Sequence, residues 1–169
     1  TLSSNSIYSL HEDNSGGFWI GTWVDGVDYY NPQSEKFKHV LPLPDNPNSL
    51  NNKFVNCFLD EGDKLWIGTE MGVNLYDKKN GTFKHYLSNP NDNKTLGSNA
   101  VQTIYRDNDK NLWVGTWGGG LNLFNEKNET FTRYLHKSDD PKSISSNNVS
   151  YILELANGDM WISTMGAGI

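Results

Sequence analysis

Short runs of aromatic, aliphatic and β-branched residues recur along the chain, separated by turns rich in Gly, Asn and Asp. Such runs are typical of β-strands, and such turns are typical of tight hairpins. Four of the runs contain the same tetrapeptide, Trp-Ile/Val-Gly/Ser-Thr, which begins at Trp19, Trp66, Trp113 and Trp161. The interval between these tryptophans is about 47 residues, and a fixed period of this length indicates a repeat architecture.

Each repeat is predicted to contain four short strands. The first strands are expected at 7–12, 54–59, 101–106 and 149–154, and the second strands contain the tetrapeptide. The third strands are expected at 27–30, 73–76 and 121–124, and the fourth run over 37–40, 83–86 and 131–134. No segment has a sustained period of 3.6 residues, so essentially no helix is predicted.

Four antiparallel strands in about 47 residues are typical of one propeller blade. The sequence therefore predicts an all-β fold, a β-propeller fragment of about three and a half four-stranded antiparallel blades in one segment. The expected blades are 1–47, 48–94 and 95–142, with a partial blade at 143–169. The small residue inside each second strand, Gly21, Gly68, Gly115 or Ser163, is expected to leave room for a side chain of the next blade. Because propellers usually have four to eight blades, we expect a piece of a longer protein or a ring completed by self-association.

Charge and composition exclude several classes of function. The formal charge of −6 and the lack of a basic cluster argue against a nucleic-acid partner. No apolar run is long enough to cross a bilayer, and no signal peptide starts at Thr1, which suggests a mature fragment or a cytosolic protein. Cys57 is the single cysteine, so no disulfide is expected within the chain. No metal, nucleophile or phosphate-loop motif occurs, and no catalytic residue, metal or cofactor is predicted.

The segment from Thr95 to Phe124 combines a TLGSN start, the string DNDKNLWVGT and the turn GGGLNLF. This pattern resembles the two-component regulator propeller repeat, and the likeness recurs four times over all 169 residues. The resemblance implies the extracytoplasmic sensor of a Bacteroides-like hybrid two-component system, which is periplasmic and detects oligosaccharides. It also implies a parent sensor histidine kinase that is anchored in the membrane outside this segment. The last repeat departs from the pattern at Ser163 and in its turn.

Polar residues that repeat with the tetrapeptide are interpreted as structural. The asparagines Asn5, Asn52, Asn99 and Asn147 are expected to satisfy backbone groups before each first strand; a ring of asparagines at the channel mouth is the alternative. The acids Asp13, Asp60 and Asp107 are expected in turns. The basic residues His39, His85 and Arg133 occupy one position in three outer strands, which suggests a solvated edge.

Residues that differ between repeats are the better candidates for function. Directly after the motif threonine come Trp23, Glu70, Trp117 and Met165. Aromatic faces stack on sugar rings and carboxylates bind their hydroxyls, so Trp23, Asp25, Glu70 and Trp117 are the candidate ligand-binding residues. The alternative is that the two indoles pack on the neighbouring blade. The polar connections 43–53, 88–98 and 137–146 are a second candidate surface, or they join adjacent blades.

Three functions remain open from the sequence. The first is a non-catalytic, ligand-sensing propeller segment of a hybrid two-component receptor, with an oligosaccharide as ligand. The second is a propeller-type lyase or glycosidase, whose first catalytic candidates would be Tyr8, His11, Glu12, Tyr105 and Tyr151. The third is a protein-interaction or dimerisation scaffold, which self-associates or contacts the rest of a longer ectodomain.

Overall fold

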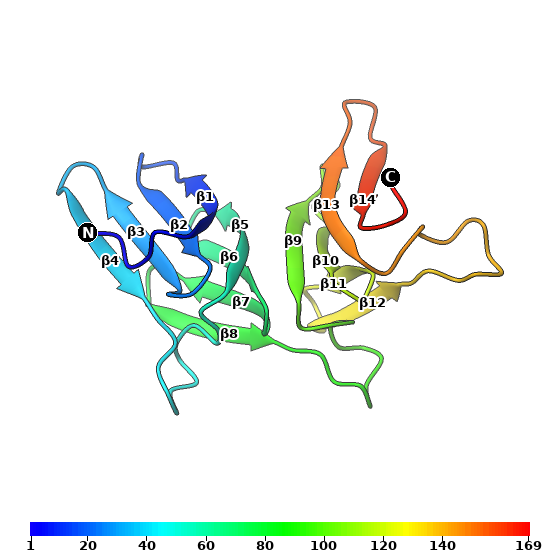
Figure 1. Cartoon of the computed structure of the whole chain (residues 1–169), viewed down its shortest axis with the longest axis horizontal. Helices are drawn as coiled ribbons and strands as arrows, with labels where there is room; N and C mark the ends of the chain where they lie inside the picture. The colour runs from blue at the N-terminus through cyan, green and yellow to red at the C-terminus, as the bar shows by residue number, and fades with distance from the viewer. The chain divides into compact units, whose positions relative to one another are not determined.

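The computed structural model describes residues 1–169 and consists of fourteen β-strands (Figure 1). The first eight strands are β1 (Ile7–Glu12), β2 (Phe18–Thr22), β3 (Val27–Asn31), β4 (Lys36–Val40), β5 (Val55–Glu61), β6 (Lys64–Thr69), β7 (Gly72–Asp77) and β8 (Thr82–Tyr86). The other six are β9 (Val101–Arg106), β10 (Leu112–Thr116), β11 (Leu121–Asn125), β12 (Thr130–Tyr134), β13 (Val149–Glu154) and β14 (Met160–Thr164). The prediction of an all-β chain without helices is confirmed, and the structure has no helix able to span a membrane.

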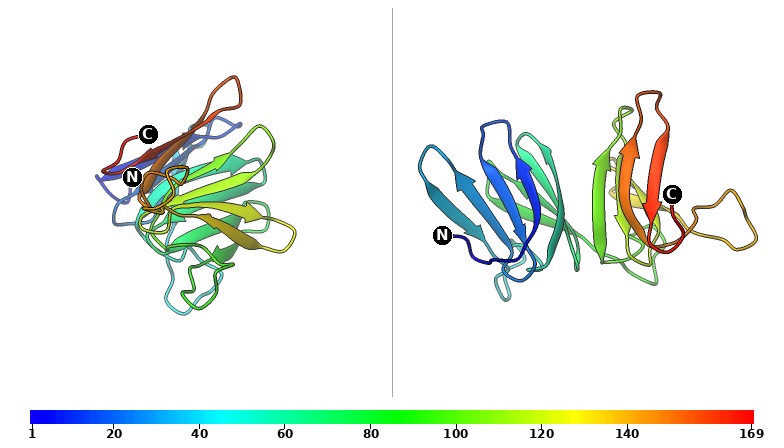
Figure 2. Two further views of the ribbon diagram at one scale, coloured as in Figure 1. Left: turned by 90° about the vertical axis from the view of Figure 1, so that its right-hand side faces the viewer. Right: turned by 45° about the horizontal axis from the view of Figure 1, so that its top comes forward.

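The chain forms two compact units, Thr1–His85 and Tyr86–Ile169. The first unit holds the four-stranded sheets β1-β2-β3-β4 and β5-β6-β7-β8, whose strands follow chain order (Figures 1 and 2). The second unit holds the sheet β9-β10-β11-β12 and the two-stranded sheet β13-β14. Within each unit the first strands of the two sheets lie next to each other, β1 beside β5 and β9 beside β13. This up-and-down order agrees with the predicted propeller fragment.

Adjacent blades pack through the small residue of the motif. A Cβ atom at Gly21 would lie only 2.9 Å from Cγ1 of Val55, which begins the first strand of the next sheet. In the second unit, a Cβ atom at Gly115 would lie 2.6 Å from Cγ1 of Val149. Both valines are fully buried. The prediction that glycine leaves room for a side chain of the next blade is confirmed at both positions.

The motif tryptophans and the first strands differ in burial between repeats. Trp19 and Trp66 are buried, but Trp161 is 49% exposed. In β1, Ile7, Tyr8 and Leu10 are also exposed. A motif tryptophan is covered by the following sheet, as Trp19 is by Tyr76 of β7. No sheet of this chain follows β13-β14 or precedes β1, so these faces remain open to solvent.

The basic residues of the outer strands are more than a solvated edge: His39 is exposed, but all three also bind polar groups of the scaffold. His39 pairs with the buried carboxylate of Asp28, and His85 Nε2 lies 2.8 Å from the carbonyl oxygen of Ser49. The Arg133 guanidinium donates to the carbonyl oxygens of Thr95 at 2.9 Å and of Leu96 at 3.1 Å. Each of these three side chains binds polar groups inside its own unit, because unpaired polar groups are costly to bury.

The repeating asparagines and acids have the structural roles expected of them. The side-chain oxygens of Asn52, Asn99 and Asn147 accept hydrogen bonds from the backbone N–H groups of Phe54, Ser88 and His136 respectively. The acids Asp13, Asp60 and Asp107 accept backbone N–H groups of the turns that follow them. These residues shape the scaffold, which leaves the non-repeating residues for function.

Candidate functional site

The motif threonine fixes the turn that presents the candidate ligand-binding residues. Its hydroxyl donates to a glycine carbonyl across the turn in every repeat, at 2.9–3.1 Å, from Thr22, Thr69, Thr116 and Thr164. The next residue then donates its backbone N–H to the segment before the first strand, and these residues are Trp23, Glu70, Trp117 and Met165. The four side chains therefore leave equivalent backbone positions.

Trp23 is partly packed and partly open. Its ring lies 4.9 Å from that of Tyr8 in β1 and 5.4 Å from that of Phe54, just before β5. The residue nevertheless remains 41% exposed. The structure thus supports both interpretations of this indole, since it contacts the neighbouring blade and still presents apolar surface to solvent.

The two acidic candidates lie in the same unit as Trp23. The backbone N–H of Asp25 donates to the Thr22 hydroxyl at 2.9 Å, which holds Asp25 in the turn after β2. Glu70 occupies the corresponding turn after β6, where its Oε1 accepts a hydrogen bond of 2.7 Å from the Asn56 amide. Both residues are half-buried. A fixed carboxylate of this kind can accept the hydroxyl of a ligand.

Trp117 belongs to the second unit and is 47% exposed. Its turn is held by the backbone bond from Trp117 to Ala100 and by the Gly118 N–H, which donates to the Asn148 side chain at 2.9 Å. The structure therefore brings Trp23, Asp25 and Glu70 into one unit and provides a second exposed indole at the equivalent turn of the other.

The predicted catalytic suspects do not form one constellation. His11 lies 3.5 Å from Asp60 of β5, while Tyr8 packs on Trp23. Tyr105 and Tyr151 belong to the other unit, where Tyr151 points to solvent. No group of His, Cys, Asp and Glu residues is arranged to hold a metal ion.

The connections between blades are tied to the scaffold. Leu50 and Leu96 are buried, and the backbone N–H of Phe83 donates to the Asn48 side chain at 2.7 Å. In the same loop Asn51 exchanges hydrogen bonds with Asn74 of β7. These contacts support the view that the loops join adjacent blades.

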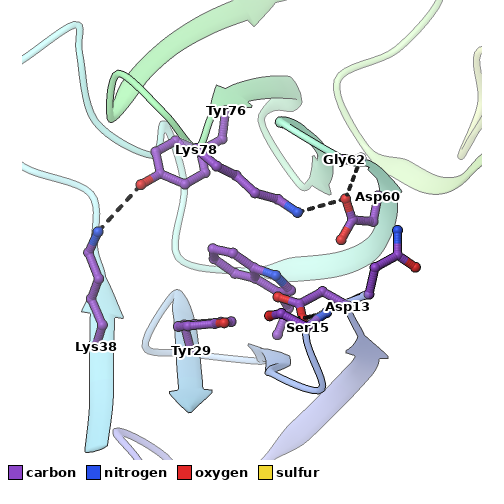
Figure 3. A pocket seen from close by; sticks show the side chains of 10 residues that line it. Asp13, Ser15, Tyr29, Lys38, Asp60, Gly62, Tyr76 and Lys78 are labelled. Atoms are coloured by element: carbon purple, nitrogen blue, oxygen red, sulfur yellow. Dashed lines mark hydrogen bonds and ion pairs between the residues drawn. The ribbon is translucent and has the colours of Figure 1, made fainter. Parts of the chain in front are cut away.

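A cavity of about 380 Å³ in the first unit was not predicted from the sequence (Figure 3). It lies between the sheets β1-β2-β3-β4 and β5-β6-β7-β8, at the end where the β1–β2 and β5–β6 hairpins turn. The lining residues are Asp13, Asn14, Ser15, Trp19, Tyr29, Lys38, Asp60, Gly62, Tyr76 and Lys78. They come from eight different strands and turns, so only the folded pair of sheets reveals the cavity.

The charged groups of this cavity are mostly paired. Lys78 Nζ lies 2.6 Å from Asp60 Oδ1 and 5.5 Å from the centre of the Trp19 ring, and Lys38 Nζ lies 3.4 Å from the Tyr76 hydroxyl (Figure 3). Burial acts to raise the pKa of the Asp13 carboxyl, but hydrogen bonds from Ser15, Gly17 and Tyr29 outweigh it and hold the pKa below its usual value. Asp13 is therefore an ionised acceptor at neutral pH.

Comparison with known families agrees with this repeat structure. The model of the two component regulator propeller matches residues 1–24, 95–118 and 143–166. Each stretch ends just after the Trp-Ile/Val-Gly/Ser-Thr motif. These three stretches are similar to the two component regulator propeller repeat. A histidine kinase, P4, of Formosa agariphila is 30% identical over 71 residues, which are 41% of this chain and 5% of that protein.

Solved structures agree with these propeller repeats. The extracellular domain assigned to a hybrid two component system of B. thetaiotaomicron is 26% identical, with a TM-score of 0.77 over 96% of this chain. This chain spans only 21% of that structure. Virginiamycin B lyase of Staphylococcus aureus shares the fold alone. It is 18% identical, with a TM-score of 0.65, and the match covers 93% of this chain and 48% of the lyase chain. The predicted likeness to the propellers of hybrid two-component sensors is confirmed by the kinase and ectodomain matches.

Proposed function

We propose that this two-component regulator propeller segment is part of the periplasmic sensor of a membrane-anchored hybrid two-component receptor, and that its ligand is an oligosaccharide. The observation that carries the ligand assignment is the pair of exposed indoles, Trp23 and Trp117, at equivalent turns. Exposed indoles on a rigid turn offer flat apolar faces to sugar rings. Asp25 and Glu70 add carboxylates that accept sugar hydroxyls.

The mechanism follows from differential binding. A ligand changes the output only if it binds one arrangement of the receptor better than another. We infer that the propeller turns contact the ligand, and that the open faces at β1 and β14 contact another copy or the rest of a larger ectodomain. Exposed Trp161, Tyr151 and Leu153 support such a contact because they form an apolar surface.

A calorimetric titration of the chain against plant and host oligosaccharides, with chromatography of each mixture, tests this proposal. We expect saturable binding with no products. Trp23→Ala and Trp117→Ala should each weaken the affinity about tenfold, which corresponds to the loss of one aromatic contact. Met165→Ala is the matched control, because Met165 occupies the equivalent turn position and is exposed without being an aromatic platform.

Two results would contradict the proposal. Release of shortened sugars would indicate an enzyme and would favour the lyase or glycosidase alternative. Equal loss of affinity in all three variants would mean that the turns act on stability and do not contact the ligand.

A further inference from the structure

The indole N–H of Trp19 has no hydrogen-bond acceptor in the structure. Trp19 is only 5% exposed, and its Nε1 atom is buried. The corresponding indoles of the next two repeats are paired, since Trp66 Nε1 donates to Glu61 and Trp113 Nε1 donates to Asp107, each at 2.7 Å. Because a buried donor without a partner is costly, this difference between repeats needs a cause.

In the first repeat the acid that corresponds to Asp107 is engaged by other donors. Asp13 stands where Asp107 stands in the third repeat, but its Oδ1 accepts hydrogen bonds from the backbone N–H and hydroxyl of Ser15 and from the Gly17 N–H. The Tyr29 hydroxyl also contributes to lowering the pKa of this carboxyl. Tyr29 lies opposite Trp19 in the sheet. The residues opposite the motif tryptophan in the next two repeats are leucines, Leu75 and Leu123, which cannot compete for an acid.

Gly17 belongs to the same local adaptation. A Cβ atom at this position would overlap with the Tyr29 hydroxyl and ring. The corresponding residues in the next two repeats are Lys64 and Asn111, which have side chains. Gly17 and Tyr29 therefore occur together in the first repeat. This is the repeat in which the Trp19 N–H lacks an acid as acceptor.

The unpaired N–H belongs to a residue that lines the cavity of the first unit. Trp19 occupies the same strand position as Trp66 and Trp113, whose N–H groups point to the preceding hairpin turn. In the first repeat that turn contains Asp13 and Asn14, and both line the cavity together with Trp19. We propose that this cavity is a subsite for one uncharged sugar unit, with a sugar hydroxyl oxygen accepting the hydrogen bond from Trp19 Nε1.

The chemistry of the lining favours a neutral polyol. Two carboxylates, Asp13 and Asp60, are balanced by two ammonium groups, Lys38 and Lys78, so a charged ligand would leave an unmatched charge. A hydroxyl both donates and accepts, and it can therefore bridge the indole N–H and a carboxylate. The ring of Tyr29 supplies an apolar wall for the C–H face of a sugar. The volume of about 380 Å³ lies at the small end of the range for ligand pockets.

This subsite is separate from the surface of Trp23. Trp19 lies near the start of β2 (Phe18–Thr22), and Trp23 follows its end, so the two indoles mark opposite ends of one strand. At about 3.3 Å per residue they are on the order of 13 Å apart. The inference thus goes beyond the proposed function and shares with it only the class of ligand.

The test is a nuclear magnetic resonance titration that follows the indole N–H signals of the six tryptophans. The signal of Trp19 is the one that disappears in Trp19→Phe. If Trp19→Phe does not fold, the signal is identified as the one that moves in Tyr29→Leu. D-glucose, D-galactose, D-mannose and L-rhamnose are the neutral probes, and D-glucuronate and D-glucosamine are their charged counterparts. We expect a saturable shift of the Trp19 signal with a neutral sugar and a weaker response to its charged counterpart.

Tyr29→Leu is the decisive variant because it copies the next two repeats and releases Asp13 to the indole. It should move the Trp19 signal without any sugar and weaken sugar binding about tenfold. Trp23→Ala should leave the Trp19 response unchanged. The inference is overturned if no sugar shifts the Trp19 signal up to its solubility limit, or if Tyr29→Leu binds as the parent does. A third outcome separates the two proposals. If Trp23→Ala abolishes oligosaccharide binding, Tyr29→Leu preserves it and no sugar shifts the Trp19 signal, then this subsite is overturned and the proposed function stands.

Discussion

Asp107 closes the turn between β9 and β10 and also accepts the indole N–H of Trp113. Burial acts to raise the pKa of its carboxyl, but the hydrogen bonds from Trp113 and Asn111 outweigh that effect and lower the pKa. A lowered pKa in the folded state means that the carboxylate stabilises the fold above the usual aspartate pKa of about 4. This stabilisation is lost as the pH falls through the lower, folded value.

Asp107→Asn should therefore reduce the free energy of unfolding at neutral pH by about 1–3 kcal/mol. The difference between parent and variant should shrink as the solution becomes more acidic than about pH 4, because the parent carboxyl is then protonated too. Urea unfolding followed by tryptophan fluorescence at several pH values measures this. Asp109→Asn, in the same turn but exposed, is the control. A pH-independent difference would contradict the role given to the charge.

Single residues also show where sequence reasoning stops. The repeat alone predicted that Gly21 and Gly115 leave room for a neighbouring side chain, since a small residue recurs at that position. It did not predict that the Trp19 N–H lacks the acid partner that Trp66 and Trp113 have. A leucine-to-tyrosine difference between repeats is visible in the sequence, but its consequence depends on a third residue that only the strand register brings close.

At the scale of elements, the predicted strands agree with the observed ones to within one or two residues, because the alternation and turn signals are local. The role of the basic residues in the outer strands was misjudged because their partners are distant in the sequence. Arg133 on β12 binds carbonyl oxygens of residues 92–96, about forty residues earlier in the chain. A basic residue in an outer strand gives no local sign of such a partner.

Arg133→Gln should loosen the connection that precedes β9. The guanidinium donates to the carbonyl oxygens of Asp92, Thr95 and Leu96, and a hydrogen bond that involves a charged group contributes about 1.5–3 kcal/mol net. We expect faster amide hydrogen exchange in residues 88–98 and a lower melting temperature. Lys127→Gln, an exposed cation in the turn after β11, is the control. Unchanged exchange in this loop would show that the arginine does not anchor it.

At the scale of the whole molecule, the sequence predicted a repeat array, and the structure adds a division into the units Thr1–His85 and Tyr86–Ile169. In a repeat protein, stability is approximately a sum of repeat and nearest-neighbour terms. The exposed faces of β1 and of Trp161 follow from the same rule, because a blade buries its apolar surface only against an adjacent blade. These faces could not be predicted from the motif, because its tryptophan recurs in buried and exposed repeats alike.

A substitution at one interface should consequently act within its own unit. Gly115→Val would place side-chain atoms against Val149 and Thr103, where even a Cβ atom would lie 2.6 Å from each. Overpacking of this kind costs about 1–3 kcal/mol, so we expect a lower unfolding free energy. Hydrogen exchange should rise in residues 86–169 and change little in residues 1–85, since the two blades joined by Gly115 both belong to the second unit. Gly118→Ala, which meets no neighbouring atom but has a positive φ, separates backbone strain from overpacking. Equal acceleration of exchange throughout the chain would show that the two units unfold as one.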